Sequence, residues 1–239
     1  MKLLFWTFFL PPNDFDAILK KAECLNIYNT KYESRLLSLD LSVKYFGDLI
    51  GNESDIYIVG KICQRKCPVV IIDRASGMGA GRSEYYAIIF SESGDRLDTQ
   101  YLFAQSYEYN NEYEYSFLVL SDSLIEVKSE KKDLTKLKYF YLAEDEIKEV
   151  FPGLANPDRK FSISTEQIIP YKELKKYKQE DLDIMRNEIF ADHGYIFKTE
   201  KWVKYFSKQP WYTPSFDNVD SKLSMIEKIN IKTILEVSN

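Results

Sequence analysis

The β-rich fold of this chain follows from two apolar runs, Ile56-Tyr57-Ile58-Val59-Gly60-Lys61-Ile62 and Pro68-Val69-Val70-Ile71-Ile72-Asp73. β-branched and aromatic residues fill both runs, as is typical of strands. The polar turn Gln64-Arg65-Lys66 and its flanking cysteines separate them. A connection this short makes the strands antiparallel neighbours, because a parallel pair needs a crossover of about a dozen residues or more.

Runs of the same kind recur about every 10 residues through the next part of the chain. Two turns separate some of them: Glu92-Ser93-Gly94, whose glycine can adopt a positive φ, and Ser121-Asp122-Ser123. No helix-length insertion interrupts the series, so we expect an antiparallel meander of about seven or eight strands. The further runs cover residues 84–90, 95–103, 107–117, 118–127 and 137–142.

Two segments before the meander carry other patterns. Residues 13–24 show apolar side chains at the spacing of one helix face, and Asp14 can cap the start of that helix. Residues 35–46 fit two interpretations. Their alternation favours a strand, while Asp40 also fits the start of a short helix.

After the meander the pattern becomes helical, beyond the breakers Pro152-Gly153 and Asn156-Pro157. One helix carries an apolar stripe and ends at Gly194, a second starts at Thr199, and a third starts near Asp220. We therefore predict an α+β fold in which an antiparallel β-meander domain precedes a small helical domain. The predicted divisions are 1–155 for the β-rich domain with its short N-terminal helix, 156–174 for a linker and 175–239 for the helical domain.

The composition is that of a folded globular protein, with 45% hydrophobic and 29% charged residues among 239. Asp and Glu outnumber Lys and Arg by 37 to 32, which leaves a net charge of −5. This charge argues against nucleic acid as a partner, because neutralising phosphates requires a basic face. The single histidine, His193, excludes every metal site that needs more than one imidazole.

Three cysteines, Cys24, Cys63 and Cys67, are too few for a disulfide scaffold. Three interpretations remain open: a Cys63–Cys67 disulfide across the hairpin turn, a zinc site made by the three cysteines with His193, or small apolar side chains beside a turn. The spacing lacks the tight pair of a zinc knuckle. We therefore predict neither a metal nor a cofactor.

The N-terminal segment joins Met1-Lys2 to an apolar run from Leu3 to Leu10, ahead of Pro11-Pro12. A charged residue before a short apolar run is typical of an export signal, but no small-residue cleavage site follows. A degenerate export signal and a buried apolar strand both remain open. The run is too short for a bilayer, which takes about 20 residues, and we predict no transmembrane span.

Aromatic residues make up 15% of the chain, and Tyr107, Tyr109, Tyr113 and Tyr115 alternate with mostly polar residues in one short segment. If residues 110–112 form a hairpin loop, Tyr109 lies opposite Tyr113 and Tyr107 opposite Tyr115. The four rings then share one sheet face. That face is either part of the core or an exposed platform that binds sugar or peptide.

The chain contains no catalytic motif. The glycine-rich residues 76–83 lack the spacing of a phosphate loop, and a strand pattern follows them instead of a helix. A hydrolase with His193 as its base would need a nucleophile motif, and none is present. A carboxylate pair remains an alternative only because Asp and Glu are abundant. We therefore expect no enzymatic activity.

A long motif in the helical part resembles the signature of the YARHG domain: Arg186-Asn187-Glu188-Ile189-Phe190-Ala191-Asp192-His193-Gly194-Tyr195-Ile196-Phe197. The family pattern runs Arg-Asn-Glu-Ile-Tyr-Ala-Arg-His-Gly-Tyr-x-Phe. Tyr205-Phe206 and Gln209-Pro210-Trp211-Tyr212 match its second block, and residues 223–227 match its closing helix. The resemblance covers residues 175–235. Asp192 replaces the family's arginine and reverses its charge, so an anion-binding role of that arginine does not transfer. Phe190 for tyrosine removes only a hydroxyl.

The resemblance implies a small extracellular module of bacterial lipoproteins and other envelope proteins, with no established catalytic role and a suggested association with the cell wall. It implies an extracytoplasmic location, in the periplasm or at the cell surface. The implied partner is a cell-wall glycan or an envelope protein. We therefore expect a non-enzymatic binding or scaffolding protein. The alternative is a glycan- or peptide-binding protein that uses the tyrosine face.

The motif residues themselves are expected to act mainly in structure. Gly194 fits a glycine that ends a helix with positive φ. His193 stands in the last helical turn, where the helix dipole favours a cation, and is expected to form a hydrogen bond there and to pack near Trp211 or Tyr212. The motif positions are Arg186, Asn187, Glu188, His193, Gly194, Tyr195, Phe197, Trp211 and Tyr212.

Overall fold

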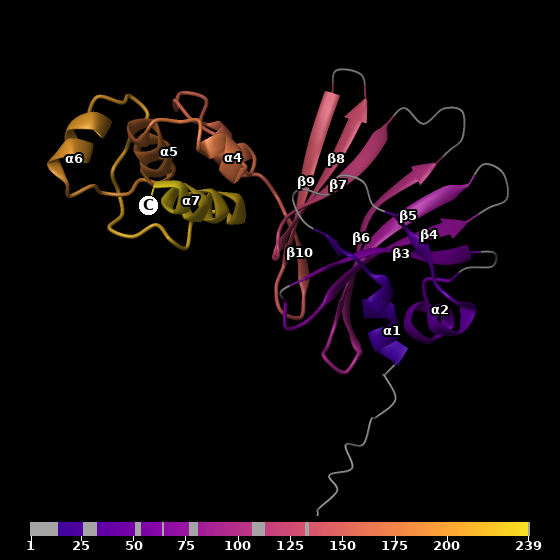
Figure 1. Ribbon diagram of the computed structural model, residues 1–239. Helices are drawn as coiled ribbons and strands as arrows, with labels where there is room; N and C mark the ends of the chain where they lie inside the picture. The colour runs from indigo at the N-terminus through magenta and orange to yellow at the C-terminus, as the bar shows by residue number, and fades with distance from the viewer. Residues whose placement is uncertain are drawn as a thin grey trace, which may run out of the picture. The chain divides into compact units, whose positions relative to one another are not determined.

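The computed structural model describes residues 14–25, 33–50, 54–63, 65–76, 81–106, 113–131 and 134–238. The chain folds as two compact units, Met1–Glu149 and Val150–Asn239. The first unit is rich in β-strands and the second is helical (Figure 1). The predicted α+β fold, with antiparallel strands before a small helical part, is confirmed. The apolar run from Leu3 to Leu10 lies outside the described residues.

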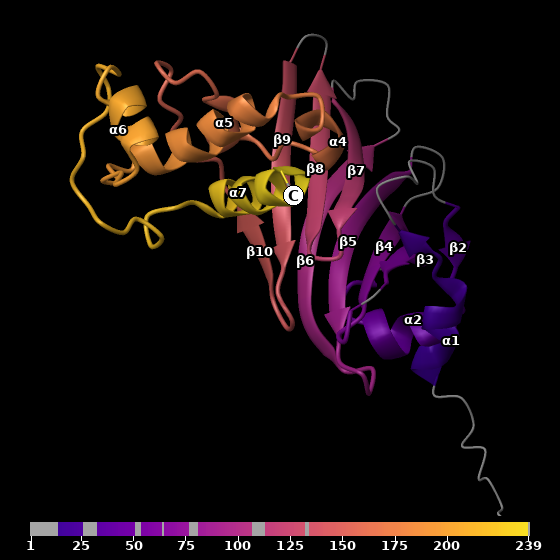
Figure 2. The same ribbon diagram turned by 60° about the vertical axis from the view of Figure 1, so that its left-hand side comes forward.

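The predicted meander is present, but it divides into two sheets. Eight consecutive strands, β3 to β10, follow each other in chain order, and the break falls between β6 and β7 (Figure 2). The first sheet has six strands, because the short strands β1 and β2 both pair with β3. Its strands are β1 (Cys24–Leu25), β2 (Arg35–Leu36), β3 (Ser54–Ile62), β4 (Val69–Ser76), β5 (Arg82–Phe90) and β6 (Arg96–Ser106). The second sheet holds β7 (Glu114–Ser121), β8 (Leu124–Lys131), β9 (Leu134–Leu142) and β10 (Ile147–Val150).

Strand β4 is buried on both faces. Val69 and Ile71 enter the core that also holds side chains of the second sheet, whereas Val70 and Ile72 enter a core shared with two helices. All four side chains are fully buried. A strand covered on both sides needs an apolar residue at every position, which explains why this run does not alternate.

The two helices of the β unit are α1 (Asp14–Lys21) and α2 (Leu39–Phe46). Phe15 of α1 and Phe46 of α2 are buried in one core, and both rings lie beside Phe90 of β5. The helix predicted for residues 13–24 is therefore confirmed at its centre. The open choice for residues 35–46 is resolved as a two-residue strand followed by a helix, because Phe46 must reach the core.

The turn between β5 and β6 contains Gly94 with φ of +91°, as the sequence predicts. A Cβ atom at this position would lie 2.8 Å from Phe15 of α1. A glycine at position 94 therefore allows the turn its positive φ and also lets α1 approach the turn closely.

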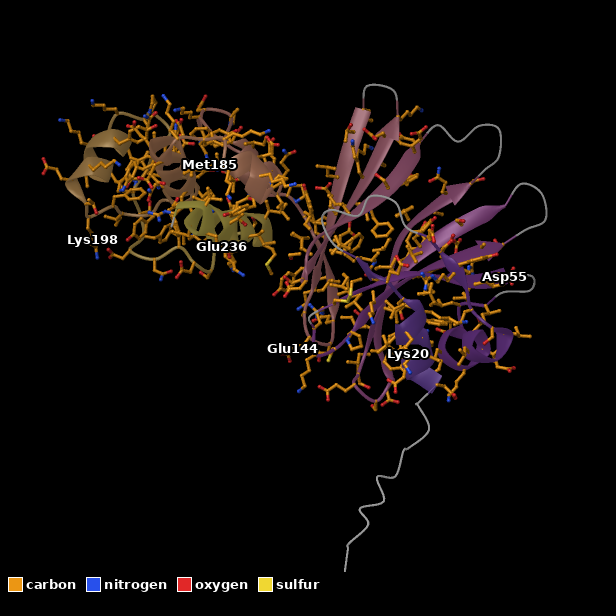
Figure 3. The ribbon with its side chains drawn as sticks, in the orientation of Figure 1. Lys20, Asp55, Glu144, Met185, Lys198 and Glu236 are labelled. Carbon is orange, nitrogen blue, oxygen red and sulfur yellow. A yellow bond between two sulfur atoms is a disulfide. The ribbon has the colours of Figure 1, made fainter. Side chains whose placement is uncertain are left out.

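The helical unit contains α3 (Ile163–Glu166), α4 (Tyr171–Leu174), α5 (Gln179–Asp192), α6 (Glu200–Phe206) and α7 (Met225–Ser238). Met185, labelled in Figure 3, is fully buried at the centre of one core with Leu174 and Ile234. A second core around Phe206 is almost entirely aromatic. Residues 156–174 differ from the linker expected for them: they carry α3 and α4, and they bury Phe161 and Ile169 among the other helices.

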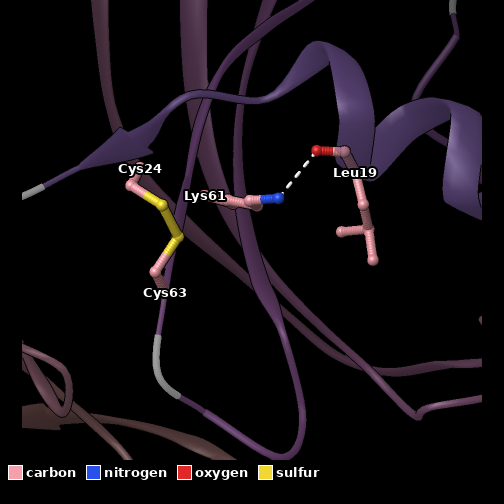
Figure 4. The surroundings of a disulfide bond; sticks show 4 residues. All are labelled: Leu19, Cys24, Lys61 and Cys63. Atoms are coloured by element: carbon pink, nitrogen blue, oxygen red, sulfur yellow. Dashed lines mark hydrogen bonds between the residues drawn. A yellow bond between two sulfur atoms is a disulfide. The ribbon is translucent and has the colours of Figure 1, made fainter.

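The disulfide joins Cys24 to Cys63 and leaves Cys67 free (Figure 4). This pairing excludes two of the open interpretations, the Cys63–Cys67 disulfide and the zinc site made by all three cysteines. The reason is the parallel pairing of β1 with β3, which sets Cys24 opposite Lys61 and brings the Cα atoms of Cys24 and Cys63 to 5.5 Å. Sequence spacing cannot reveal this approach, because β2 and α2 lie between the two strands in the chain. The Lys61 ammonium also donates to the Leu19 carbonyl at 2.8 Å.

The turn between β3 and β4 is tied to the second sheet by Arg65. Its guanidinium donates to the carbonyl of Asp122 at 2.9 Å, to that of Leu142 at 3.0 Å and to that of Ala143. Backbone carbonyls at two turns of the second sheet are thus satisfied by one side chain of the first. Arg65 therefore fixes the two sheets to each other at this end.

Replacing Cys63 with serine is expected to lower the free energy of unfolding by about 4 kcal/mol, because the disulfide restricts the unfolded chain over a sequence separation of 39 residues. Chemical denaturation followed by circular dichroism measures this loss. Cys67→Ser leaves the disulfide intact and is the matched control. A Cys63→Ser protein as stable as the Cys67→Ser protein would contradict the assigned pairing.

Candidate functional site

The predicted tyrosine face lies only partly within the described residues. Tyr107 and Tyr109 fall outside them, so their pairing with Tyr115 and Tyr113 stays a prediction. Tyr115 of β7 is half-buried and packs against the core between the two sheets. Its ring stacks on Phe103 of β6 with centroids 5.6 Å apart. Tyr113 lies beside it, at 6.3 Å between ring centroids.

A row of four residues crosses the first sheet next to these rings. The strand register sets Tyr57 opposite Asp73, Asp73 opposite Tyr85 and Tyr85 opposite Phe103. Residues paired in this way share one sheet face, and Phe103 marks it as the face toward the second sheet. The Tyr85 ring stacks on Phe103 at 4.5 Å. We refer to Asp73, Tyr85, Phe103 and Tyr115 as the aromatic end.

Asp73 is the charged residue of the aromatic end, and only 9% of its surface is exposed. Burial raises the pKa of its carboxyl, although hydrogen bonds from Ser83 and Tyr85 oppose that rise. Oδ2 accepts from the Ser83 hydroxyl at 3.2 Å, whereas Oδ1 is buried and has no hydrogen-bond partner. A buried acceptor without a donor costs about 1–3 kcal/mol, so this oxygen is a place where a ligand donor would be stabilising.

Glu84, one residue before Tyr85, faces the opposite side of the sheet and is fully paired. Arg74 and Arg82 both form ion pairs with its carboxylate, at 2.5 and 3.0 Å. The Tyr86 hydroxyl donates to it at 2.9 Å. Burial, together with this carboxylate, raises the pKa of Tyr86 to about 12. Two neighbouring carboxylates in one sheet thus differ sharply in how well they are satisfied.

Sequence reasoning missed Asp73, Tyr85 and Phe103 as candidate site residues. One signal was present, since Asp73 is the charged residue that ends an apolar run buried on both faces. What placed it beside two rings is the strand register, which the sequence does not state. In the described part of the chain, no group of three or more His, Cys, Asp or Glu side chains is arranged to hold a metal ion.

In the helical unit, the motif starts within α5, and its glycine, Gly194, ends that helix. The N–H of Gly194 donates to the Ala191 carbonyl at 2.9 Å, and that of Tyr195 donates to the Phe190 carbonyl at 3.0 Å. Gly194 has φ of +79°, as predicted. This pair of bonds is the Schellman arrangement, which satisfies the last carbonyls of a helix.

Glu188 and Asn187 hold neighbouring backbone in place. The Glu188 carboxylate accepts the N–H groups of Lys160 and Phe161 at 3.0 and 2.8 Å. The Asn187 amide donates to the Asp183 carbonyl at 2.7 Å. Both side chains are nearly completely buried. They act here as satisfied structural groups.

His193 pairs with Glu227 of α7, at 2.9 Å from its Nε2 to Oε2. Glu227 is 1% exposed and also accepts from the Thr165 hydroxyl at 2.8 Å and the Ser224 N–H at 2.8 Å. The Glu227 N–H donates in return to the Ser224 hydroxyl at 3.2 Å, which makes Ser224 and Glu227 a capping box for α7. Glu227 therefore joins three parts of the unit. The contact of His193 with Trp211 or Tyr212 stays a prediction.

The aromatic motif residues line the second core of the unit. Phe197 stacks on Phe206 with centroids 4.6 Å apart, and Tyr195 meets Phe197 edge-on at 5.1 Å. The Tyr212 hydroxyl donates to the Tyr195 carbonyl at 2.7 Å. Trp211 contacts Phe206 edge-on. Arg186 contributes no hydrogen bond from its buried Nε in the described structure.

Comparison with known families decides the identity of this unit. Residues 160–239 match the family model of the YARHG domain. We refer to this matching segment as the YARHG domain. The comparisons with curated proteins and with solved structures find no match. The match to the family model starts at residue 160, whereas the resemblance recognised in the sequence starts at residue 175.

The contacts of the YARHG domain explain this earlier start. Glu188 holds the backbone of residues 160 and 161. Asn230 of α7 accepts from the Ile169 N–H at 2.9 Å and donates to the Ser164 carbonyl at 2.8 Å. These buried hydrogen bonds require residues 160–174 to fold with the later helices.

Asp192, one of the two positions that depart from the family pattern, is paired with Arg159. Its Oδ2 lies 3.1 Å from Nη1 of Arg159, whose side chain is completely buried. Arg159 also donates to the Thr165 hydroxyl at 2.7 Å, and so connects Asp192 to Glu227. The reversed charge of Asp192 is thus neutralised inside the YARHG domain.

Two buried glutamates of the YARHG domain have pKa values shifted in opposite directions. Burial raises the pKa of Glu188 despite the two backbone N–H groups. Burial also acts to raise the pKa of Glu227, but the hydrogen bonds from His193, Ser224 and Thr165 outweigh it and lower the pKa below 4.5. Glu227 is therefore held in its charged form by the fold.

Gly194→Ala is expected to lower the free energy of unfolding by about 1–2 kcal/mol, because alanine is strained at positive φ. Its Cβ would also lie 3.0 Å from the Thr213 carbonyl oxygen. Thermal unfolding of both proteins measures the loss. Gly194→Asn is the control, since asparagine tolerates this conformation better and should lose less. Equal stability of the alanine variant and the parent would show that this residue does not end α5 as described.

Glu227→Gln is expected to destabilise the protein at neutral pH by about 1.5–3 kcal/mol, since a charged acceptor is lost. The lowered pKa of Glu227 means that its contribution is complete above pH 4.5 and is lost as the pH falls further. The stability gap between parent and variant should therefore narrow below pH 4.5. Urea denaturation at several pH values tests this, with Glu236→Gln, an exposed change on the same helix, as control. A gap that stays constant down to acid pH would refute the role.

Proposed function

We propose that this protein is a non-enzymatic binding protein of the bacterial cell envelope and that its ligand site is the aromatic end. The observation that carries the proposal is the buried Asp73 Oδ1, which has no hydrogen-bond partner and lies beside stacked rings. Stacked aromatic rings offer flat apolar area, and a carboxylate oxygen accepts hydrogen bonds. This combination suits a cell-wall glycan or a peptide of an envelope protein.

Two observations support an extracytoplasmic location. YARHG domains are typical of extracellular and envelope proteins. The Cys24–Cys63 disulfide adds independent support, because disulfides persist in oxidising compartments and are rare in the cytosol. None of the helices in the described ranges is long and apolar enough to cross a membrane.

The arrangement of ionisable groups supports a binding role over catalysis. The only histidine is committed to the buried Glu227. Asp73 and Glu84 lie on adjacent strands but face opposite sides of the sheet, so they do not form the facing pair that a carboxylate-pair hydrolase needs. The YARHG domain then serves as a structural module whose polar groups are largely used internally.

Isothermal titration calorimetry of the full chain against muropeptides, chitin oligosaccharides and short peptides tests the proposal. We expect at least one of these classes to bind, and Tyr115→Leu to weaken that binding by about tenfold through loss of a stacking ring. Tyr171→Leu, the same change at an exposed position of α4, is the control and should bind like the parent. Binding that is insensitive to Tyr115→Leu, or absent for every class, would overturn the proposal.

A further inference from the structure

We infer that the ligand group recognised at Asp73 is a primary ammonium on an apolar stem, such as the side chain of a lysine residue in a peptide. The inference rests on the proposed function of the aromatic end as the ligand site. It adds the chemical class of the group that enters.

The charge of Asp73 is the first step of the argument. Within the described structure its hydrogen-bond donors are the Ser83 and Tyr85 hydroxyls, which are neutral, and no Lys or Arg forms an ion pair with it. Glu84 on the next strand has two arginines. A buried carboxylate without a cation is poorly compensated. A cationic ligand supplies the missing charge, whereas a neutral sugar hydroxyl does not.

The second step is the geometry around the unpaired oxygen. Asp73 lies between Tyr57 and Tyr85 in its row, and the stack continues through Phe103 to Tyr115. An ammonium can donate to Oδ1 while aromatic faces attract its charge and contact its methylene stem. A carboxylate with flanking tyrosine rings therefore satisfies each part of an alkylammonium group.

The same ring cluster already holds an ammonium at its margin. The Lys131 Nζ of β8 lies 5.2 Å from the centroid of the Tyr113 ring, and Tyr113 contacts Tyr115. This internal contact shows that the rings here present a face on which an ammonium can rest. Asp73 lies on the face of the first sheet that is turned toward these rings, and its Oδ1 has no hydrogen-bond partner.

The hydroxyl of Tyr85 competes with the ligand for Asp73. Oδ1 is buried, so a ligand must displace a neighbouring side chain, and Tyr85 is half-buried and bonded to this carboxylate. Tyr85→Phe keeps the ring but removes the donor. It is therefore expected to strengthen ammonium binding, whereas Asp73→Asn weakens it.

Calorimetric titration with two matched probes tests the inference on the unmodified protein. N-acetyl-lysine amide carries the ammonium, and N-acetyl-norleucine amide has the same stem without it. We expect the lysine probe to bind about tenfold more tightly than the norleucine probe. Equal binding of the two, or binding of chitin oligosaccharides without binding of the lysine probe, would overturn the inference and leave the proposed function standing.

The variants then locate the contact. We expect Asp73→Asn to weaken binding of the lysine probe by about tenfold and Tyr85→Phe to tighten it, while Glu92→Gln at the opposite end of the sheet changes nothing. Unchanged affinity in a folded Asp73→Asn protein would place the ammonium elsewhere and overturn the inference. If Tyr115→Leu weakens neither the binding of the lysine probe nor the binding of any other ligand, the proposed function fails as well.

Discussion

Burial of β4 on both faces is the constraint on which the β unit depends. Its run of four fully buried aliphatic residues requires a second sheet on one side and helices on the other. The meander meets this requirement by dividing after β6, and α1 and α2 cover the remaining face. Arg65 then fastens the two sheets to each other, and the Cys24–Cys63 disulfide joins β1 to the end of β3 within the first sheet.

The YARHG domain depends on a different principle, the complete pairing of buried polar groups. Its cores are small, and Glu227 reaches donors from Thr165, His193 and Ser224. A buried carboxylate left unpaired would be costly, so satisfying it fixes the relative positions of segments that are far apart in the chain. Arg159 extends the same network to Asp192.

The two units therefore contain buried carboxylates in opposite states. Glu227 has donors at both oxygens, and its pKa is lowered, whereas Asp73 has a free buried oxygen, and its pKa is raised. Full pairing indicates a structural group. Our proposal places the ligand site in the β unit and not in the motif, because the unpaired oxygen of Asp73 lies beside stacked rings.

The strand runs, the turn glycine Gly94, the helix-ending Gly194 and the YARHG match could all be predicted from the sequence, because each depends on a few neighbouring residues. It predicted the α+β order for the same reason. Four features could not be predicted from it: the division into two sheets, the Cys24–Cys63 pairing, the fold of residues 160–174 with the later helices, and the row from Tyr57 to Phe103. These features depend on strand register and on contacts between distant segments. Local periodicity gives the face of a residue along its own strand, but it does not state which residue of another strand lies opposite.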